Sequence, residues 1–270
     1  MAVEELKKTL VLGHRNPDTD SICSAICYAG FKHQLTGENY EPCRAGNVSP
    51  ETQYVLDYFK LKAPRLVENV KTQVKDIEIR KTKGVSRGIS LKNAWGLMQE
   101  NNVVTLPCVT EEGLLEGVIT IGDITKSYMN LYDSSIISKA CTKYANILDT
   151  LEGSMVVGDS EAYFDRGKVL IAAANPDLME NYIEKHDLVI LGNRYESQLC
   201  AIEMEAGCII VCEGAGVSLT IRKLAQERGC AVITTPYDTY TTARLINQSM
   251  PISYFMTKEN IIEFSEEDYL

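Results

Sequence analysis

The stretch TLVLGHRNPDTDSICSAICYAG, residues 9–30, joins a short apolar run to a histidine and two aspartates. Residues 9–13 are apolar and end in glycine, which is typical of a strand that stops at a tight turn. Residues 19–35 carry apolar side chains at helical spacing, and Asp18 or Thr19 stands where a helix N-cap is expected. The stretch predicts a strand, a turn and a helix, with the polar side chains at the carboxyl end of the strand.

The same alternation continues along the next part of the chain. YEPCRAG at 40–46 predicts a second strand, and Ser49 before Pro50 and Glu51 is a strong helix start. Strand–helix–strand–helix is the opening of a parallel α/β sheet, and ligands bind at the carboxyl edge of such sheets.

The remaining chain predicts two further regions. The spacing after residue 90 predicts a helix over 91–101, strands over 103–109 and 114–120, and a helix from about Asp123. Residues 153–248 alternate apolar strands with helices, which predicts a second, mostly parallel sheet. Four helices are expected between those strands, near residues 177–185, 195–206, 217–228 and 239–248. The predicted fold class is α/β.

Composition limits the classes of function. The chain has 270 residues and a net charge of −10, which argues against a nucleic acid bound over a broad basic face. No uninterrupted apolar run approaches the ~20 residues that span a bilayer, so no membrane partner is expected. The N-terminus lacks the pattern of a signal peptide. The nine cysteines are therefore expected to be reduced, small apolar side chains in a cytoplasmic protein.

The polar side chains of the first motif allow two interpretations. His14 precedes Asp18 by four residues, and Asp18 and Asp20 flank Thr19, so the carboxylates can face two metal ions, or one metal ion and one hydrogen-bond partner. Mixed nitrogen and oxygen ligands suit manganese, iron, cobalt or zinc better than calcium. Alternatively, Asn-Pro-Asp is a turn, Asp18 or Thr19 caps the helix, and His14 has no role. The spacing excludes neither interpretation.

The stretch GHRNPDTDSICSAICYA resembles the N-terminal motif of the DHH phosphoesterase superfamily, in the form found in manganese-dependent, family II inorganic pyrophosphatases. The resemblance implies that His14 and Asp18 bind one Mn²⁺ (or Co²⁺) ion and Asp20 the other, two per active site. These ions would bind pyrophosphate and activate a water for its hydrolysis to two phosphates. The family also has a later Asp-His-His motif, but His33 and His186 are the other histidines of this chain. We therefore expect no complete catalytic set here and no activity from this chain by itself.

A second resemblance concerns nucleotides. GVITIGDI at 117–124, with VVTLPCV before it, resembles a CBS motif, the adenosyl-binding module. The resemblance implies that Thr120 contacts phosphate and Asp123 contacts ribose, and Lys126 follows closely enough to reach the phosphate. The alternative is that Thr120 is an ordinary strand residue and Asp123 an ordinary helix cap.

Two more stretches complete the layout. The chain after the first CBS motif resembles a DRTGG domain, although its name-giving turns differ from the signature, and PISYFMTKENIIEFSEEDYL at 251–270 resembles the start of a second CBS motif. The expected domains are the N-terminal part of a DHH domain (1–69), a CBS motif (70–126), a DRTGG-like domain (127–248) and the truncated start of a second CBS motif (249–270).

This layout resembles the nucleotide-regulated subclass of family II pyrophosphatases. The resemblance implies regulation by AMP, ADP and ATP-like ligands at the CBS motifs, and a homodimer formed through the regulatory region. On this interpretation the chain is the N-terminal half of a regulated inorganic diphosphatase. One alternative is a non-catalytic CBS/DRTGG module that senses adenine nucleotides. Another is a DHH phosphoesterase for short oligonucleotides or nucleotide phosphates.

Overall fold

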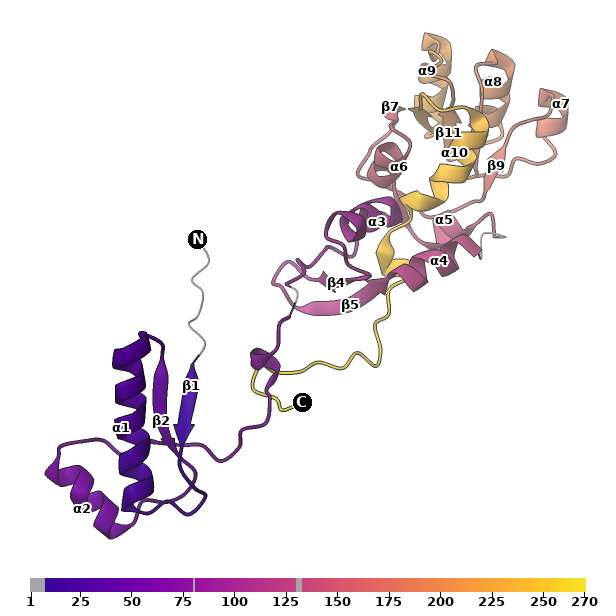
Figure 1. The fold of residues 1–270 in the computed structure, drawn as a ribbon. Coiled ribbons are helices and arrows are strands. Elements are labelled where there is room, and N and C mark those ends of the chain that lie inside the picture. The colour runs from indigo at the N-terminus through magenta and orange to yellow at the C-terminus, as the bar shows by residue number, and fades with distance from the viewer. Residues whose placement is uncertain (1–7, 80, 130–132) are drawn as a thin grey trace. The chain divides into compact units, whose positions relative to one another are not determined.

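The computed structural model describes residues 8–79, 81–129 and 133–270, and the described chain divides into two compact units (Figure 1). The first unit takes in the residues up to Ile79 together with Phe264–Leu270. The second unit takes in the residues between these two segments. Each unit is described by itself.

The first unit contains, within residues 8–79, a parallel sheet of three strands in the order β1-β2-β3. Its elements in chain order are β1 (Thr9–Leu12), α1 (Thr19–Thr36), β2 (Tyr40–Arg44), α2 (Pro50–Tyr58) and β3 (Arg65–Leu66). The predicted order of strand, helix, strand and helix is confirmed. Ser49 is the N-cap of α2, as expected, and its hydroxyl accepts the N–H of Thr52.

Helix α1 is capped at both ends. Asp18 is the N-cap, and its Oδ1 accepts the N–H of Ser21 at 2.9 Å. Gly37 ends the helix with a φ of 72°, a left-handed conformation that favours glycine, and its N–H donates to the carbonyl of His33. The helix buries Ile22 and neighbours at helical spacing against the sheet, so its first turn stays at the carboxyl end of β1.

A short segment of the first unit joins distant parts of the sequence. The 3₁₀ helix η1 (Val74–Asp76) lies beside the last residues of the chain, where Gln73 pairs with Tyr269 as an antiparallel bridge. The N–H of Leu270 donates to the carbonyl of Thr72 at 3.0 Å.

The second unit begins with an antiparallel hairpin flanked by helices. Its elements are α3 (Leu91–Glu100), β4 (Thr105–Val109), β5 (Leu115–Thr120) and α4 (Ile121–Met129). A later segment returns to this hairpin, because Pro251 pairs with Ser90 and Thr257 pairs with Val118. The bridge through Thr257 lies on the edge of β5, whose other edge is paired with β4.

The larger sheet of the second unit has, in the described chain, five strands in the order β7-β12-β11-β10-β9. The strands are β7 (Ser154–Val157), β9 (Val169–Ile171), β10 (Leu188–Leu191), β11 (Cys208–Val211) and β12 (Ala231–Thr234). Strands β9 to β12 are parallel and β7 runs antiparallel to β12, so the expected mostly parallel sheet is confirmed. The main helices around it are α8 (Tyr195–Glu203), α9 (Leu219–Arg228) and α10 (Thr239–Leu245).

The second unit also contains several smaller elements. They are α5 (Ile136–Lys139), β6 (Thr142–Lys143), α6 (Tyr144–Thr150), β8 (Tyr163–Phe164), α7 (Pro176–Met179), η2 (Ile246–Ser249) and η3 (Ile252–Tyr254). The sequence pattern did not predict α5, β6, α6 or β8.

Both faces of the five-stranded sheet are buried, each in a different core. In β10, Leu188 and Ile190 belong to a core that also contains Leu106 of the hairpin. Val189 and Leu191 belong to the core on the opposite face, with side chains of α8 and α9. The alternation of side chains along a strand separates these neighbours. The hairpin and the sheet therefore share one continuous core.

One expected helix is shorter in the structure than the sequence predicts. The helix expected near 177–185 ends at Met179. It cannot extend to residue 185, because the N–H of Glu184 donates to the buried carboxylate of Asp187, just before β10, which also accepts the N–H of Lys168. The nine cysteines are all free, and Cys27 and Cys141 are the exposed ones among them. In the part of the chain that the structure describes, we find no helix with the length and apolar character needed to cross a bilayer.

Candidate functional site

The loop after β1 carries the proposed metal ligands. It leaves the strand at Gly13 and enters α1 at Asp18, so its side chains lie at the carboxyl end of a parallel strand. The extended backbone of Asp18 (φ −89°, ψ −177°) is the conformation that an N-cap requires. Local capping therefore places the carboxylate at the edge of the sheet where ligands bind in this class of fold.

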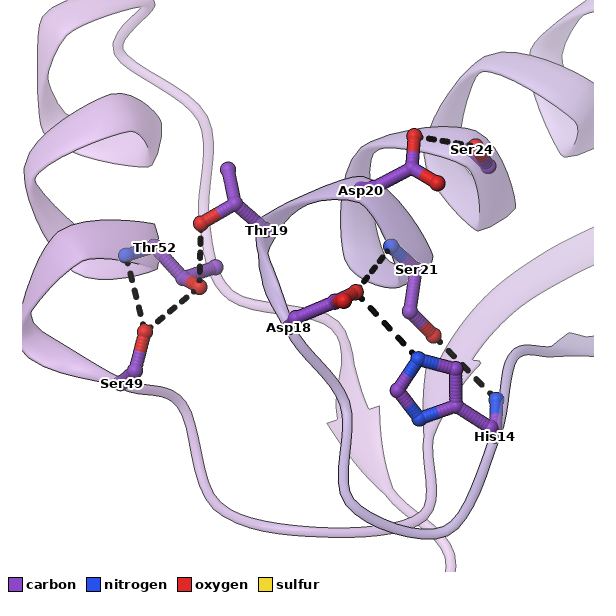
Figure 2. Close-up of polar contacts among 8 residues, drawn as sticks. All are labelled: His14, Asp18, Thr19, Asp20, Ser21, Ser24, Ser49 and Thr52. Atoms are coloured by element: carbon purple, nitrogen blue, oxygen red, sulfur yellow. Dashed lines mark hydrogen bonds and ion pairs between the residues drawn. The ribbon is translucent and has the colours of Figure 1, made fainter.

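His14 and Asp18 lie side by side in this loop. The Nε2 of His14 is 3.3 Å from the Oδ1 of Asp18, and the two side chains are 58% and 67% exposed (Figure 2). The backbone N–H of Ser21 holds the pKa of Asp18 below its ordinary value, and the charge of a protonated His14 lowers it further. The carboxylate is therefore ionised at neutral pH, as a metal ligand must be.

Asp20 points elsewhere. It lies in the first turn of α1, where its Oδ1 accepts a 3.5 Å hydrogen bond from the Ser24 hydroxyl (Figure 2). Within the described residues, no group of three or more histidine, cysteine, aspartate or glutamate side chains is placed to hold a metal ion. The structure therefore brings together two of the three expected ligands. One imidazole nitrogen and one open carboxylate form a donor set that fits Mn²⁺ or Co²⁺.

Ser21, in the first turn of α1, is a residue beside this loop that the sequence analysis missed. Its side chain is 8% exposed, and its hydroxyl accepts the backbone N–H of His14 at 3.2 Å. A Cβ at Gly13 would lie 1.8 Å from the Ser21 hydroxyl oxygen, so a larger residue there would displace the hydroxyl that accepts the N–H of His14. In the sequence, Gly13 directly before His14 was the sign that the loop passes close to another side chain.

The second set of expected residues lies at the junction of β5 and α4. The Thr120 hydroxyl donates to Oδ2 of Asp123 at 2.7 Å, and the Thr120 N–H donates to the same oxygen at 3.0 Å. The Asp123 N–H in turn donates to the Thr120 hydroxyl at 3.2 Å. This reciprocal arrangement caps the first turn of α4 and brings Thr120 and Asp123 together. Lys126 is exposed on the next turn of the helix, and α4 begins at Ile121 rather than at Asp123.

A separate hollow of about 870 Å³ lies elsewhere in the second unit. Its lining includes the basic side chains Arg87, Lys143 and Lys258, and it does not include Thr120 or Asp123. Arg87 is paired with a glutamate at 3.2 Å, and Lys143 is paired with another. The volume would accommodate a nucleotide-sized molecule. A sequence pattern carries no signal for this hollow, because its lining combines residues of 86–93, 140–146 and 251–258 with Glu111 and Tyr163.

Comparison with known proteins identifies the parts of the chain. The family model described as CBS domain matches residues 74–130, and the model described as DRTGG domain matches residues 146–249. The cobalt-dependent inorganic pyrophosphatase of Clostridium perfringens is 40% identical over 258 residues, covering 96% of this chain and 47% of that relative. A probable manganese-dependent inorganic pyrophosphatase of Thermotoga maritima is 30% identical, covering 95% of this chain and 47% of that relative.

A solved structure decides the assignment. The CBS and DRTGG domains of the regulatory region of the Clostridium perfringens pyrophosphatase, complexed with the activator diadenosine tetraphosphate, match with a TM-score of 0.69 and 36% identity. The match covers 73% of this chain and 86% of that one. The chain belongs to the family of CBS- and DRTGG-containing inorganic pyrophosphatases.

Membership in the CBS- and DRTGG-containing pyrophosphatases confirms the resemblance to regulated inorganic pyrophosphatases with CBS and DRTGG domains. The chain spans about half the length of the curated relatives it matches. The roles of His14, Asp18 and Asp20, and those of Thr120, Asp123 and Lys126, remain predictions.

Proposed function

We propose that this chain carries the first metal-ligand motif and the nucleotide-responsive region of a metal-dependent inorganic pyrophosphatase. Such an enzyme hydrolyses pyrophosphate to two phosphates. The observation that carries the proposal is the His14–Asp18 pair at the carboxyl end of a parallel strand, in a chain 40% identical to a cobalt-dependent inorganic pyrophosphatase. The second relative, named as manganese-dependent, supports Mn²⁺ or Co²⁺ as the metal.

In this proposal His14 and Asp18 hold one ion and Asp20 holds a second. When bound, two such ions polarise phosphoryl oxygens and lower the pKa of a bound water. The protein contributes the geometry: the N–H of Ser21 keeps the Asp18 carboxylate charged, and the Ser21 hydroxyl holds the backbone of His14. Three side chains do not fill the ligand shells of two ions, so the complete site requires further ligands from the rest of such an enzyme.

We further propose that adenine nucleotides bind at the junction of β5 and α4. Thr120 would contact phosphate, Asp123 would accept hydrogen bonds from the ribose hydroxyls, and Lys126 would pair with phosphate. The nucleotide activator named with the solved relative supports this assignment, and AMP, ADP and ATP-like molecules are the ligand class. Oδ2 of Asp123 already accepts from the Thr120 N–H and hydroxyl, so the ribose hydroxyls would donate to Oδ1.

The proposed domains are the N-terminal part of a DHH domain (1–69), a CBS motif (70–126), a DRTGG domain (127–248) and the start of a second CBS motif (249–270). The family-model matches at 74–130 and 146–249 support the middle two. The bridges from Pro251 and Thr257 to the hairpin support the last. Assembly as a homodimer through the regulatory region belongs to the same proposal. So does a cytoplasmic location, which the nine free cysteines support.

The metal proposal is tested by titrating Co²⁺ into the 270-residue chain and recording its visible absorption. We expect binding that is lost in His14→Ala and in Asp18→Asn. The matched control is His33→Gln, since His33 lies at the far end of α1 and its Nδ1 contacts the carbonyl of Glu38. Binding that survives both ligand substitutions would contradict the assignment.

The same samples test for activity. We expect no phosphate release from pyrophosphate with Mn²⁺ or Co²⁺ when this chain is assayed alone, because the ligand set is incomplete. Turnover near ~10 s⁻¹, typical of enzymes, would show that the chain forms a complete site.

The nucleotide proposal is tested by calorimetry with AMP and with diadenosine tetraphosphate. We expect Asp123→Ala to abolish binding. Asp238→Ala is the matched control, because Asp238 caps α10 through the Thr241 N–H and hydroxyl in the second unit. Equal losses in both variants would attribute the effect to helix capping rather than to ligand contact.

A second candidate function is a non-catalytic module that senses adenine nucleotides. It is favoured by one observation: no three-ligand metal group exists among the described residues. Nucleotide binding without any Co²⁺ binding by this chain would support it over the pyrophosphatase proposal.

A further inference from the structure

A chain of hydroxyl groups connects the two helices of the first unit beside the proposed metal ligands. The Oγ1 of Thr52 lies 2.8 Å from the Ser49 hydroxyl and 3.0 Å from the Thr19 hydroxyl (Figure 2). Thr52 is fully buried in the first turn of α2, and Ser49 is the N-cap of that helix. The first turns of α1 and α2 are thus joined through one buried hydroxyl.

Hydrogen-bond chemistry makes this connection specific. A hydroxyl has one proton to donate and can accept, so Thr52 can donate to one neighbour while accepting from the other. The Ser49 hydroxyl is also fixed, because it accepts the N–H of Thr52 at 3.1 Å. A buried hydroxyl without partners is costly, so the three groups stabilise one arrangement of the two helix ends.

The position of Thr19 gives this connection a consequence for the ligands. Thr19 stands between Asp18 and Asp20 in the sequence, and its side chain is directed toward α2. Asp18 is directed toward His14, and Asp20 toward Ser24 (Figure 2). Because the hydrogen bond to Thr52 fixes Thr19, it also fixes the directions in which the carboxylates of Asp18 and Asp20 point.

We propose that Thr52 is a positioning residue for the metal-ligand loop and acts through the hydroxyl of Thr19. The inference rests on the proposed metal site. It adds a residue of α2 to that site, whereas all the expected metal ligands come from the β1–α1 loop and the start of α1. Partners that orient metal ligands without touching the metal typically affect metal affinity by about 10-fold or more when removed.

The test is a titration of the 270-residue chain with Mn²⁺, following free Mn²⁺ by electron paramagnetic resonance and the broadening of the His14 ring signals by NMR. Thr52→Val removes the hydroxyl and keeps the shape of the side chain. We expect it to weaken Mn²⁺ binding about 10-fold and Thr52→Ser to restore it. Thr19→Val should weaken binding equally, and the double variant should be no weaker than either single one, because both remove the same connection.

The control is Thr36→Val, which removes a hydroxyl bond to the Lys32 carbonyl at the far end of α1. We expect unchanged Mn²⁺ binding. Three results would each overturn the positioning role. The first is equal weakening of Mn²⁺ binding in the Thr36→Val control, and the second is unchanged Mn²⁺ binding in Thr52→Val. The third is an additive loss of Mn²⁺ binding in the Thr19→Val, Thr52→Val double variant. Absence of Mn²⁺ binding in the unsubstituted chain would instead overturn the proposed metal site.

Discussion

Two short strands, each rich in leucine and valine, differ in burial between the two units. TLVL forms β1 in the first unit, and LVIL forms β10 in the second. Every residue of β10 is buried, whereas Thr9 and Leu10 of β1 are exposed. Strand β10 lies inside a five-stranded sheet with a core on each face, and β1 lies at the edge of a three-stranded sheet.

The difference shows that the layers around a strand decide its burial. Parallel strands are usually covered on both faces, and β10 and β11 meet that condition through the hairpin on one side and α8 and α9 on the other. Strand β1 presents a similar apolar sequence without equivalent cover. We therefore expect the second unit to hold most of the stability and the first unit to respond weakly to changes in its strands.

The largest expected effect is a difference between the two sheets in the stability lost when one apolar side chain is shortened. Ile210→Ala in β11 removes a fully buried side chain and should lower the free energy of unfolding of the second unit by about 3–4 kcal/mol. Leu10→Ala in β1, where the side chain is 36% exposed, should cost the first unit about 1 kcal/mol or less. Hydrogen exchange of the amides of each sheet measures both values separately. Similar losses in the two sheets would break the comparison.

The reactivity of single cysteine thiols tests the difference in burial between exposed positions and the core of the five-stranded sheet. Cys27 of α1 and Cys141 are exposed, whereas Cys208 and Cys230 are buried in the second unit. Burial raises the pKa of the Cys230 thiol to about 12, so little thiolate exists at neutral pH. We expect an aromatic disulfide reagent to label the exposed pair at once and the buried pair only after unfolding. Rapid labelling of Cys230 in the folded protein would contradict the burial of the sheet.

The smallest expected effect is a pH dependence within the second unit. Asp133 has a pKa lowered from 3.8 to about 2, mainly by the Lys139 ammonium 2.5 Å away and also by Ser135. Its stabilising contribution is present above pH 3.8 and is lost as the pH falls toward 2. Asp133→Asn should therefore flatten the acid limb of thermal unfolding. Asp177→Asn, at an exposed helix start in the same unit, is the control and should leave that limb unchanged.

Much of the fold could be predicted because local signals agreed with the tertiary structure. Asp18 and Ser49 cap the helices that the sequence assigned to them, and the central strands β10 and β11 of the five-stranded sheet follow apolar runs. The signals failed where a distant group decided the local structure. Asp187 accepts the N–H of Glu184 and so prevents a helix through residue 185, and α6 begins after Lys143 without a side-chain cap.

The candidate site was predictable in part for the same reason. The side chains of His14 and Asp18 meet because the two residues are only four positions apart in one short loop. Asp20 lies in the first turn of α1, and its carboxylate contacts Ser24 of the same helix. The contribution of Ser21 and the bridge through Thr52 depend on packing between elements, and Thr52 is 33 residues from Thr19 in the sequence. A pattern within one short motif carries no signal for such a partner.

The bridge between Val118 and Thr257 has a consequence for the order in which the chain is made. Strand β5 leaves the ribosome about 140 residues before the residue that pairs with its second edge. At roughly 5–20 residues per second, that edge waits on the order of ten seconds for its partner. An unpaired strand edge can pair with another chain during that interval. During synthesis, this edge of the hairpin is therefore open to pairing with other chains until Thr257 has been made.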